Sequence, residues 1–255
     1  MKKILSILVT MVACIKIMMA GEVFIPEDRY SELRKMNVVL SDPALTIRAV
    51  IEKPESYVLK LEARSRNGGQ FITAYLDKSS SELYMGSAYD KTGNTLLFPF
   101  NEKYVKEGIS FSYGIGKKEI YLITDPECPY CTKFAKAMEG KLAEYTVHVI
   151  FMPLSFHKKA PAMVEWILKG KDDTQRKARY DALLLKGSTE YAKDLKQPFG
   201  YSAEVKEKMA KAELATMELK VRGTPALYDA NFKPISQNRL LGIDQKSRKP
   251  KVRKN

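Results

Sequence analysis

The feature that most constrains this chain is residues 121–138, with the sequence YLITDPECPYCTKFAKAM. An apolar run typical of a strand reaches an Asp-Pro bend, and a CPYC motif then begins a segment with the spacing of an amphipathic helix. The two cysteines of the motif, Cys128 and Cys131, are the only ones beyond the first twenty residues. A strand that turns into a helix at a CxxC motif indicates redox chemistry.

Two other interpretations of the CxxC pair are a structural disulfide and one part of a zinc site. Zinc needs four ligands, and the two histidines of the chain, His148 and His157, do not have finger or ribbon spacing. The sequence therefore favours a redox-active pair, and both alternatives stay open beside it.

Their positions on the expected helix give the two cysteines different roles. Cys128 lies at the helix start, where unpaired backbone N–H groups and the positive dipole end stabilise a thiolate, so we expect it to be the nucleophile. Cys131 lies one turn into the helix, and we expect it to be the shielded thiol that resolves a mixed disulfide. Pro129 suits the first helical turn, and Tyr130 supplies aromatic surface beside the reactive sulfur.

The first twenty residues have the pattern of an export signal. They combine a basic start, an apolar core and a small residue, Ala20, and they are too short and too interrupted by Lys16 for a membrane span. Cys14 faintly resembles a lipoprotein processing site, so lipid anchoring is the minor alternative to cleavage near Ala20. We therefore predict a signal peptide at 1–20 and an oxidising compartment, in which disulfide chemistry has substrates.

Positive charge is concentrated at the end of the chain. The formal net charge is +13, and six of the last ten residues are Lys or Arg. Residues 244–255 are predicted to be a disordered basic tail that aids solubility, with contact to anionic lipid or acidic partners as the alternative. Nucleic-acid binding is not expected, because no aromatic or docking element accompanies the charges.

Residues 21–97 have the pattern of a small unit with one helix and an antiparallel sheet. An apolar residue at every third position predicts a short helix over 27–36. Alternating residues at 57–63, an Asn-Gly-Gly turn and a second apolar run predict a hairpin that ends near residue 76. Two further strand-like runs, 83–89 and 95–98, flank another turn.

A sheet of this size has edges that must be covered or paired, so we expect residues 21–97 to pair with a second copy. They contain no candidate nucleophile, metal cluster or phosphate loop. Residues 98–117 are rich in glycine and are predicted to be a linker with a short helix.

Residues 118–243 have the order of a mixed α/β domain. A strand, the CPYC helix and a second strand form a βαβ opening, and a helical insertion separates it from a last pair of strands. The insertion is expected to hold three helices at 161–168, 174–185 and 203–219. Trp166 is expected to be a core residue, while His148 on a strand and His157 in a loop are not expected to be catalytic.

The second informative motif is Gly-Thr-Pro at 223–225, where an X-Pro bond that enters a strand can be cis at little cost. On its own this motif indicates only a turn. CPYC after an Asp-Pro bend, a helical insertion and then Gly-Thr-Pro together resemble the thioredoxin-fold oxidoreductases, in particular the DsbC/DsbG family of periplasmic disulfide isomerases.

This resemblance covers most of the chain and implies a fold. It implies an α/β thioredoxin-like catalytic domain with a helical insertion, preceded by a small α+β, cystatin-like dimerisation domain. The implied assembly is a V-shaped homodimer with its two CPYC centres facing a cleft, and the implied location is the periplasm.

The same resemblance implies roles for residues of both motifs. Cys128 attacks a misformed substrate disulfide, Cys131 resolves it, and Thr224 precedes a cis-Pro225 that lies against the two sulfurs. The backbone beside Pro225 is expected to pair with an extended substrate strand. A hydrogen bond from the Thr224 hydroxyl is expected to lower the Cys128 pKa. No cofactor is implied beyond the redox-active disulfide of Cys128 and Cys131.

Three features depart from the family pattern. The chain lacks the additional structural cysteine pair found in DsbC, and its final helix is shortened before the basic tail. Leu122 occupies the position where thioredoxins keep a buried acid, which weakens the case for a thioredoxin-like proton relay.

The expected function is isomerisation or reduction of non-native disulfides in unfolded or misoxidised exported proteins. Reduced cysteines imply a membrane electron donor of the DsbD type, because the attacking species is a thiolate. The first alternative is a dimeric oxidase recharged by a quinone-linked partner. A holdase chaperone with secondary cysteines is the second.

Overall fold

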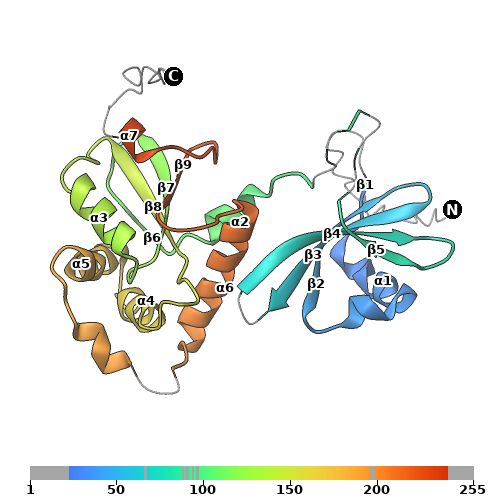
Figure 1. The fold of residues 1–255 in the computed structure, drawn as a ribbon, viewed down its shortest axis with the longest axis horizontal. Helices are drawn as coiled ribbons and strands as arrows, with labels where there is room; N and C mark the ends of the chain where they lie inside the picture. The colour runs from blue at the N-terminus through green and yellow to red at the C-terminus, as the bar shows by residue number, and fades with distance from the viewer. Residues whose placement is uncertain are drawn as a thin grey trace, which may run out of the picture. The chain divides into compact units, whose positions relative to one another are not determined.

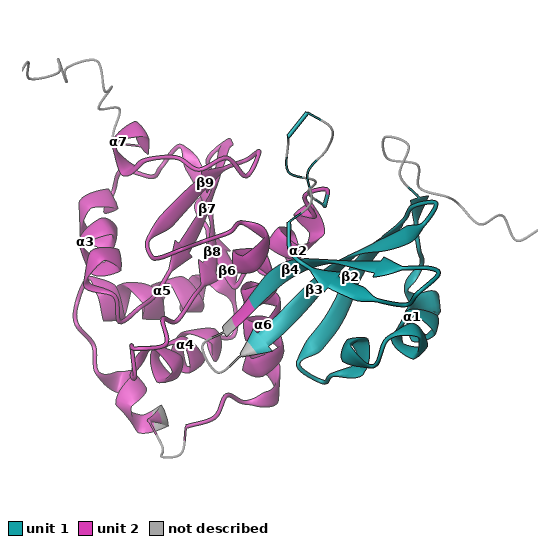
Figure 2. Ribbon diagram, turned by 45° about the vertical axis from the view of Figure 1, so that its right-hand side comes forward, with its two compact units in different colours: residues 1–65, 70–98 teal, residues 66–69, 99–255 magenta. Residues whose placement is uncertain are grey.

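The computed structural model describes residues 23–240, except 66–67, 88, 90–91, 94, 96–97 and 196–198. The predicted signal peptide with Cys14 and the predicted basic tail lie outside the described residues. The chain divides into two compact units, which Figure 2 shows in different colours. Unit 1 comprises residues 1–65 and 70–98, and unit 2 comprises residues 66–69 and 99–255.

Unit 1 is a five-stranded sheet with a short helix (Figure 1). Its strands follow one another in chain order across the sheet: β1 (Val23–Phe24), β2 (Leu45–Glu52), β3 (Ser56–Ser65), β4 (Gly68–Asp77) and β5 (Leu83–Met85). The helix α1 (Tyr30–Met36) has a 3-10 turn before it, Glu27–Arg29, and another after it, Val38–Ser41. The predicted helix and the predicted hairpin are both confirmed, and β5 is shorter than the predicted run 83–89.

The core of unit 1 lies between α1 and one face of the sheet. Leu33 of α1 packs with side chains that alternate along β3, where Leu59 and Leu61 are fully buried. On the same strand, Glu62 is also fully buried and is paired with Arg48 and Arg64. A buried carboxylate is tolerated there because each of its oxygens accepts a charged donor.

Unit 2 is a four-stranded mixed sheet covered by helices on both faces (Figure 1). Its strands are β6 (Phe111–Tyr113), β7 (Lys118–Thr124), β8 (Tyr145–Phe151) and β9 (Ala226–Asp229), in the order β6-β8-β7-β9. The two central strands, β7 and β8, are parallel, and both edge strands run antiparallel to their neighbours. The predicted mixed sheet with a βαβ opening is therefore confirmed.

The helices of unit 2 are α2 (Glu102–Glu107), α3 (Pro129–Met138), α4 (Ala160–Leu168), α5 (Asp173–Leu184), α6 (Ala203–Glu218) and α7 (Gln237–Leu240). On one face of the sheet α3, α4 and α5 cover Leu122 of β7, and on the other face α2 and α6 cover Tyr121 and Ile123. Because β7 is buried on both faces from Ile120 onward, residues 120–123 form an unbroken apolar run.

The predicted linker is wrong for much of its length. Residues 99–117 belong to unit 2, in which α2 packs on α6 and β6 forms a sheet edge beside β8. The glycines that suggested a linker are sites of close packing. A Cβ atom at Gly108 would lie 2.4 Å from the Cβ of Ala215, so α2 can end against α6 only without a side chain there.

Within the described residues, no helix is both long enough and apolar enough to cross a bilayer.

Candidate active site

The CPYC motif lies where β7 passes into α3. The bend is closed by a hydrogen bond from the Cys128 N–H to the Asp125 carbonyl oxygen, at 3.1 Å. Cys128 has extended backbone angles and caps the helix, and Pro129 occupies the first helical turn, as the sequence predicted. The first turn of α3, with its free N–H groups, therefore follows directly after Cys128, whose side chain makes no capping hydrogen bond to them.

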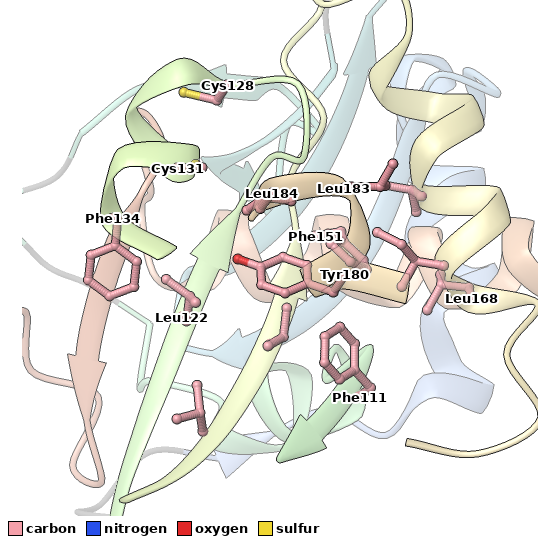
Figure 3. Close-up of a cluster of buried hydrophobic side chains, with 14 of the residues drawn as sticks. Phe111, Leu122, Cys128, Cys131, Phe134, Phe151, Leu168, Tyr180, Leu183 and Leu184 are labelled. Carbon is pink, nitrogen blue, oxygen red and sulfur yellow. The ribbon is translucent and has the colours of Figure 1, made fainter. Parts of the chain in front are cut away.

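Both cysteines are free thiols, and they differ in their surroundings. Cys128, at the start of the helix, is 3% exposed, whereas Cys131, one turn further on, is fully buried (Figure 3). Cys131 belongs to the same buried cluster as Leu122 of β7 and Tyr180 of α5. The predicted shielding of Cys131 is confirmed.

The Gly-Thr-Pro motif lies directly against the CPYC motif. The Thr224–Pro225 peptide bond is cis, and Ala226 pairs with Ile123 in the adjoining strand. The thiol of Cys128 donates to the carbonyl oxygen of Thr224 across 3.6 Å. Two segments that lie far apart in the sequence thus meet at the nucleophile expected from the sequence.

The Thr224 side chain is placed differently from the prediction. Its hydroxyl lies near Cys131 and lowers the pKa of that thiol, and its carbonyl oxygen is the group that contacts Cys128. The hydroxyl oxygen is buried and has no hydrogen-bond partner in the part of the chain that the structure describes. The expected bond from the Thr224 hydroxyl to Cys128 is therefore wrong, because the hydroxyl lies beside the other sulfur.

Burial dominates the chemistry of Cys131. Desolvation raises the pKa of this thiol to about 11, because a thiolate inside the core loses its hydration. Three donors oppose that effect: the hydroxyls of Thr124 and Thr224 and the N–H of Asp125, which lies 3.4 Å from the sulfur. The resolving thiol is thus protonated at neutral pH, although groups able to stabilise its anion surround it.

The comparison with family models agrees with this geometry. Residues 113–236 match the model described as a thioredoxin-like domain, a range that includes both motifs. These residues are a thioredoxin-like domain.

Solved structures similar to the chain are distant in sequence. A thioredoxin-like oxidoreductase from Silicibacter pomeroyi DSS-3 is 15% identical with a TM-score of 0.45, over 56% of this chain and 95% of that chain. DsbG from Helicobacter pylori is 14% identical with a TM-score of 0.36, over 78% of this chain and 99% of that chain. Proteus mirabilis ScsC in a compact conformation is 15% identical with a TM-score of 0.42, over 56% and 75% of the two chains. No curated protein matches the sequence.

The thioredoxin-like domain contains a buried acid that the sequence analysis interpreted only as part of a bend. The carboxylate of Asp125 is fully buried and accepts from the N–H groups of Glu127 and Leu154. Its Oδ2 atom also lies 2.7 Å from Nδ1 of His157. A carboxylate only accepts, so Nδ1 of His157 carries the proton.

A second acid, Glu127, connects the same loop to the CPYC motif. Oε2 of Glu127 accepts from the N–H groups of Lys159 and Ala160, at the start of α4. Together with Asp125, it fixes the loop that follows β8 beside the CPYC bend. His157, which was expected to be an uninvolved loop residue, is therefore part of the active-site framework.

His148 lies elsewhere, as predicted. Its ring contacts Tyr121, on the sheet face opposite the cysteines, and its Nδ1 atom lies 2.8 Å from the hydroxyl of Ser112. Burial lowers the pKa of His148. Trp166 is partly buried against the core and lies under the guanidinium of Arg179, which fits the predicted core role.

Two aromatic side chains are exposed on the segments that carry or adjoin the CPYC motif. Tyr130 of the CPYC motif is 67% exposed, and Phe156, in the loop fixed by Asp125, is 69% exposed. A groove of about 310 Å³ begins at Pro225 and runs beside Phe134 and the outer part of β9. No group of three or more metal-ligating side chains occurs among the residues that the structure describes.

Proposed function

We propose that this protein is a thiol:disulfide oxidoreductase that isomerises or reduces non-native disulfides in exported proteins. The observation that carries the proposal is the contact of 3.6 Å between the Cys128 sulfur and the Thr224 carbonyl oxygen, with Cys131 buried one helical turn behind. Disulfide exchange requires one thiol that attacks the substrate disulfide and a second thiol that can attack the resulting mixed disulfide. The arrangement of Cys128 and Cys131 supports both requirements.

In the first step the Cys128 thiolate attacks one sulfur of a substrate disulfide. A bond forms between Cys128 and that sulfur, the substrate S–S bond breaks, and the electron pair leaves on the other substrate sulfur, which takes up a proton. The N-terminus of α3 favours the thiolate, because its free N–H groups carry partial positive charge.

The mixed disulfide then has two outcomes. In isomerisation the released substrate thiolate attacks a different disulfide, and a substrate cysteine finally expels Cys128, so no net electrons are transferred. In reduction the Cys131 thiolate attacks Cys128 and releases the substrate as a dithiol. The protein is left as a disulfide, and a dithiol donor must reduce it before the next cycle.

Substrate binding is proposed to use the surface around Cys128. The exposed rings of Tyr130 and Phe156 and the groove that begins at Pro225 support contact with unfolded, apolar segments. The backbone of residues 224–225 supports pairing with an extended strand. No cofactor is needed in this scheme, since the Cys128–Cys131 disulfide carries the electrons.

The proposed setting is the periplasm, which the signal-like residues 1–20 support. The proposed assembly is a homodimer through unit 1, supported by the large apolar side chains Val38 and Tyr84 that are exposed on this unit. The proposed electron donor is a membrane protein of the DsbD type. An oxidase partner would replace it if the cysteines were kept as a disulfide.

A holdase chaperone is the second candidate, because unit 1 has large apolar side chains on its surface. Val38 is 83% exposed, and Tyr84 of β5 is 58% exposed. Replacing both Cys128 and Cys131 by serine separates the two functions. Suppression of aggregation that survives this replacement supports a chaperone, and its complete loss excludes one.

The proposed function is tested with a model protein whose disulfides have been scrambled. Catalytic amounts of the reduced protein in a glutathione buffer are expected to restore the activity of the scrambled substrate. Cys128→Ser is expected to abolish recovery, whereas Cys131→Ser is expected to keep slow isomerisation, since only reduction requires the second thiol. Failure to restore a scrambled substrate, together with rapid oxidation of a reduced one, would instead support the oxidase.

A further inference from the structure

Three segments of unit 2 meet at the CPYC motif, and nearly all of their charged residues are positive. The segments are residues 126–136, which contain the motif, residues 154–160 after β8, and residues 220–226 around the cis proline. Their one acid is Glu127, and their six basic residues are Lys133, Lys136, Lys158, Lys159, Lys220 and Arg222. All six basic residues are exposed. We call these six residues the basic rim.

Hydrogen bonds fix the three segments against one another. The carbonyl oxygen of Thr224 lies 3.6 Å from the Cys128 sulfur, and Arg222 is two residues before Thr224. Because consecutive Cα atoms are about 3.8 Å apart, the Cα atoms of Arg222 and Thr224 are at most about 8 Å apart. The N–H of Lys159 donates to Oε2 of Glu127, the residue before Cys128, at 2.6 Å. Positive charge therefore lies close to the nucleophile on two of its sides.

On α3 the basic rim continues beside the exposed aromatic ring of the motif. Lys133 is three positions after Tyr130, so the two side chains are neighbours on the helix surface. The Nζ atom of Lys133 lies 5.4 Å from the centre of the Tyr130 ring. Tyr130 is 67% exposed, and a chain that contacts this ring also meets the ammonium group.

The two acids next to the motif do not balance this charge. Asp125 is fully buried, and its carboxylate is directed to the N–H of Leu154 and to His157. The Glu127 carboxylate accepts backbone N–H groups at the start of α4. Even when both acids are counted, positive charges outnumber negative ones by six to two. No side chain of the basic rim forms an ion pair within the described residues.

Lysines on the other face of the sheet are arranged differently. Three lysines of α2 and α6 each pair with an acid one helical turn earlier: Lys106 with Glu102, Lys208 with Glu204, and Lys211 with Glu207. The fields of such pairs largely cancel beyond the pair itself. A group of like charges without partners instead acts over about one Debye length, which is about 8 Å at physiological ionic strength.

We propose that the basic rim sets the substrate preference of Cys128, which reacts fastest with disulfides flanked by acidic residues in unfolded polypeptides. This proposal rests on the proposed function and names the substrate class of the same site. Positive charge also attracts nucleic acids and anionic lipids. Neither of them contains a disulfide, however, and the basic rim surrounds a thiol.

The preference arises in the encounter and leaves the chemical step unchanged. Complementary charge raises the rate at which partners meet by a factor of about 10 to 1,000, and like charge lowers it. The Cys128 thiolate then forms a bond with one substrate sulfur and the substrate S–S bond breaks. The electron pair leaves on the other sulfur, which takes a proton from solvent. The basic rim neither gains nor loses a proton in this step.

The alternative is that any acidic chain is attracted by the overall charge of the protein, which is +13. Lys117→Glu is the matched control for this alternative. Lys117 is exposed and lies directly before β7, whereas the CPYC motif follows the other end of that strand. A strand of seven residues spans about 20 Å, well beyond a Debye length. Lys117→Glu and Arg222→Glu change the net charge equally, and only the second changes the basic rim.

The test uses the full chain with Cys14→Ser and Cys131→Ser, so that Cys128 is the remaining cysteine and its mixed disulfide accumulates. Three peptides of equal length each carry one cysteine as a disulfide with 2-thiopyridine, flanked by Glu, Gln or Lys. Release of the uncharged thiopyridone gives the rate. At about 20 mM salt the Glu peptide is expected to react about tenfold faster than the Lys peptide, and this ratio is expected to fall toward one at about 0.5 M salt.

The readout is the ratio of the two rates in one protein, because a change in the reactivity of Cys128 affects both peptides and cancels. Arg222→Glu and Lys133→Glu are each expected to lower the ratio about threefold at low salt. Arg222→Lys is expected to keep it, since the charge is retained, and Lys117→Glu is expected to leave it nearly unchanged.

Equal rates for the Glu and Lys peptides at low salt would overturn the proposal. An equal fall of the ratio in Lys117→Glu and Arg222→Glu would also overturn it, because the overall charge would then explain the preference. If Cys128 reacts with none of the three peptides, the proposed function fails instead.

Discussion

Nδ1 of His157 lies 2.7 Å from Oδ2 of Asp125, and the backbone N–H of the same aspartate points at the sulfur of Cys131. The loop after β8 is thus connected to the resolving thiol through a single residue. Asp125 also closes the bend before Cys128 through its carbonyl oxygen, so it contacts both redox residues. The position of the two thiols depends on this aspartate.

Replacing His157 by alanine is expected to lower stability by about 1–3 kcal/mol, because the buried carboxylate of Asp125 loses one of its donors. Urea unfolding measures the change. His148→Ala is the control, since that histidine lies on the other face of the sheet beside Ser112. A His157→Ala protein as stable as the wild type would show that the pair does not fix the loop.

The two cysteines are expected to differ in trapping experiments. Cys131→Ser should accumulate mixed disulfides with substrate proteins, because Cys128 still attacks and no resolving thiol follows. Cys128→Ser should accumulate almost none, because Cys131 is fully buried. Non-reducing gels of cells that express each variant provide the measurement, and equal trapping by both would contradict the assigned roles.

Thr224→Val is expected to lower the reduction potential of the Cys128–Cys131 pair by about 30 mV, or about 1.4 kcal/mol. The reason is that the reduced form loses a hydroxyl that lowers the Cys131 pKa. Equilibration with glutathione buffers measures the potential. Thr216→Val is the matched control, since its buried hydroxyl bonds to the Glu213 carbonyl on α6. An unchanged potential in Thr224→Val would mean that its hydroxyl does not act on the thiol.

The stability of the reduced protein is expected to fall as the pH rises above 9. Burial raises the Cys131 pKa from 9.0 to about 11, so the unfolded chain releases this proton at lower pH than the folded chain does. The protonated Cys131 thiol contributes about 3 kcal/mol to the free energy of unfolding. This contribution is complete below pH 9 and is lost between pH 9 and pH 11.

The tyrosines of the chain also ionise in this range, so Cys131→Ala serves as the reference for that pH experiment. Its unfolding free energy should vary less steeply with pH than that of the wild type over the same interval. Parallel curves for the two proteins would show that Cys131 ionises normally in the folded state.

Deleting residues 21–97 is expected to leave a monomer that still reduces small disulfides but no longer isomerises scrambled proteins. Unit 2 has its own core on both faces of its sheet, which supports folding without unit 1. Solution scattering measures the mass, and a truncated protein that stays dimeric would contradict the assignment of dimerisation to unit 1.

The parts of the fold that the sequence predicted are those with local signals. Apolar runs identified β7 and β8, because a strand that is buried on both faces has apolar residues in succession. Alternation identified β3, because a strand that is buried on one face alternates between apolar and polar residues. Strand β2 was missed. Its register shifts between Ile47 and Ala49, so that the core residues Ile47 and Val50 are three positions apart and do not alternate.

At the active site, the motifs predicted the cysteines and the cis proline but not their surroundings. His157 reaches the site from the loop after β8, and nothing in its local sequence indicates a partner. The Asp-Pro dipeptide was a usable signal for a buried acid at Asp125, since Asp also accepts backbone hydrogen bonds at bends. Leu122 is a core residue, as its apolar neighbours suggested.

The most direct test of the proposed function is the redox state of Cys128 and Cys131 inside the cell. Acid quenching followed by alkylation of free thiols measures the fraction of each form. A pair that is mostly reduced is expected, because isomerisation and reduction both begin with the Cys128 thiolate. A pair that is mostly oxidised would contradict the proposal and would indicate a protein that donates disulfides.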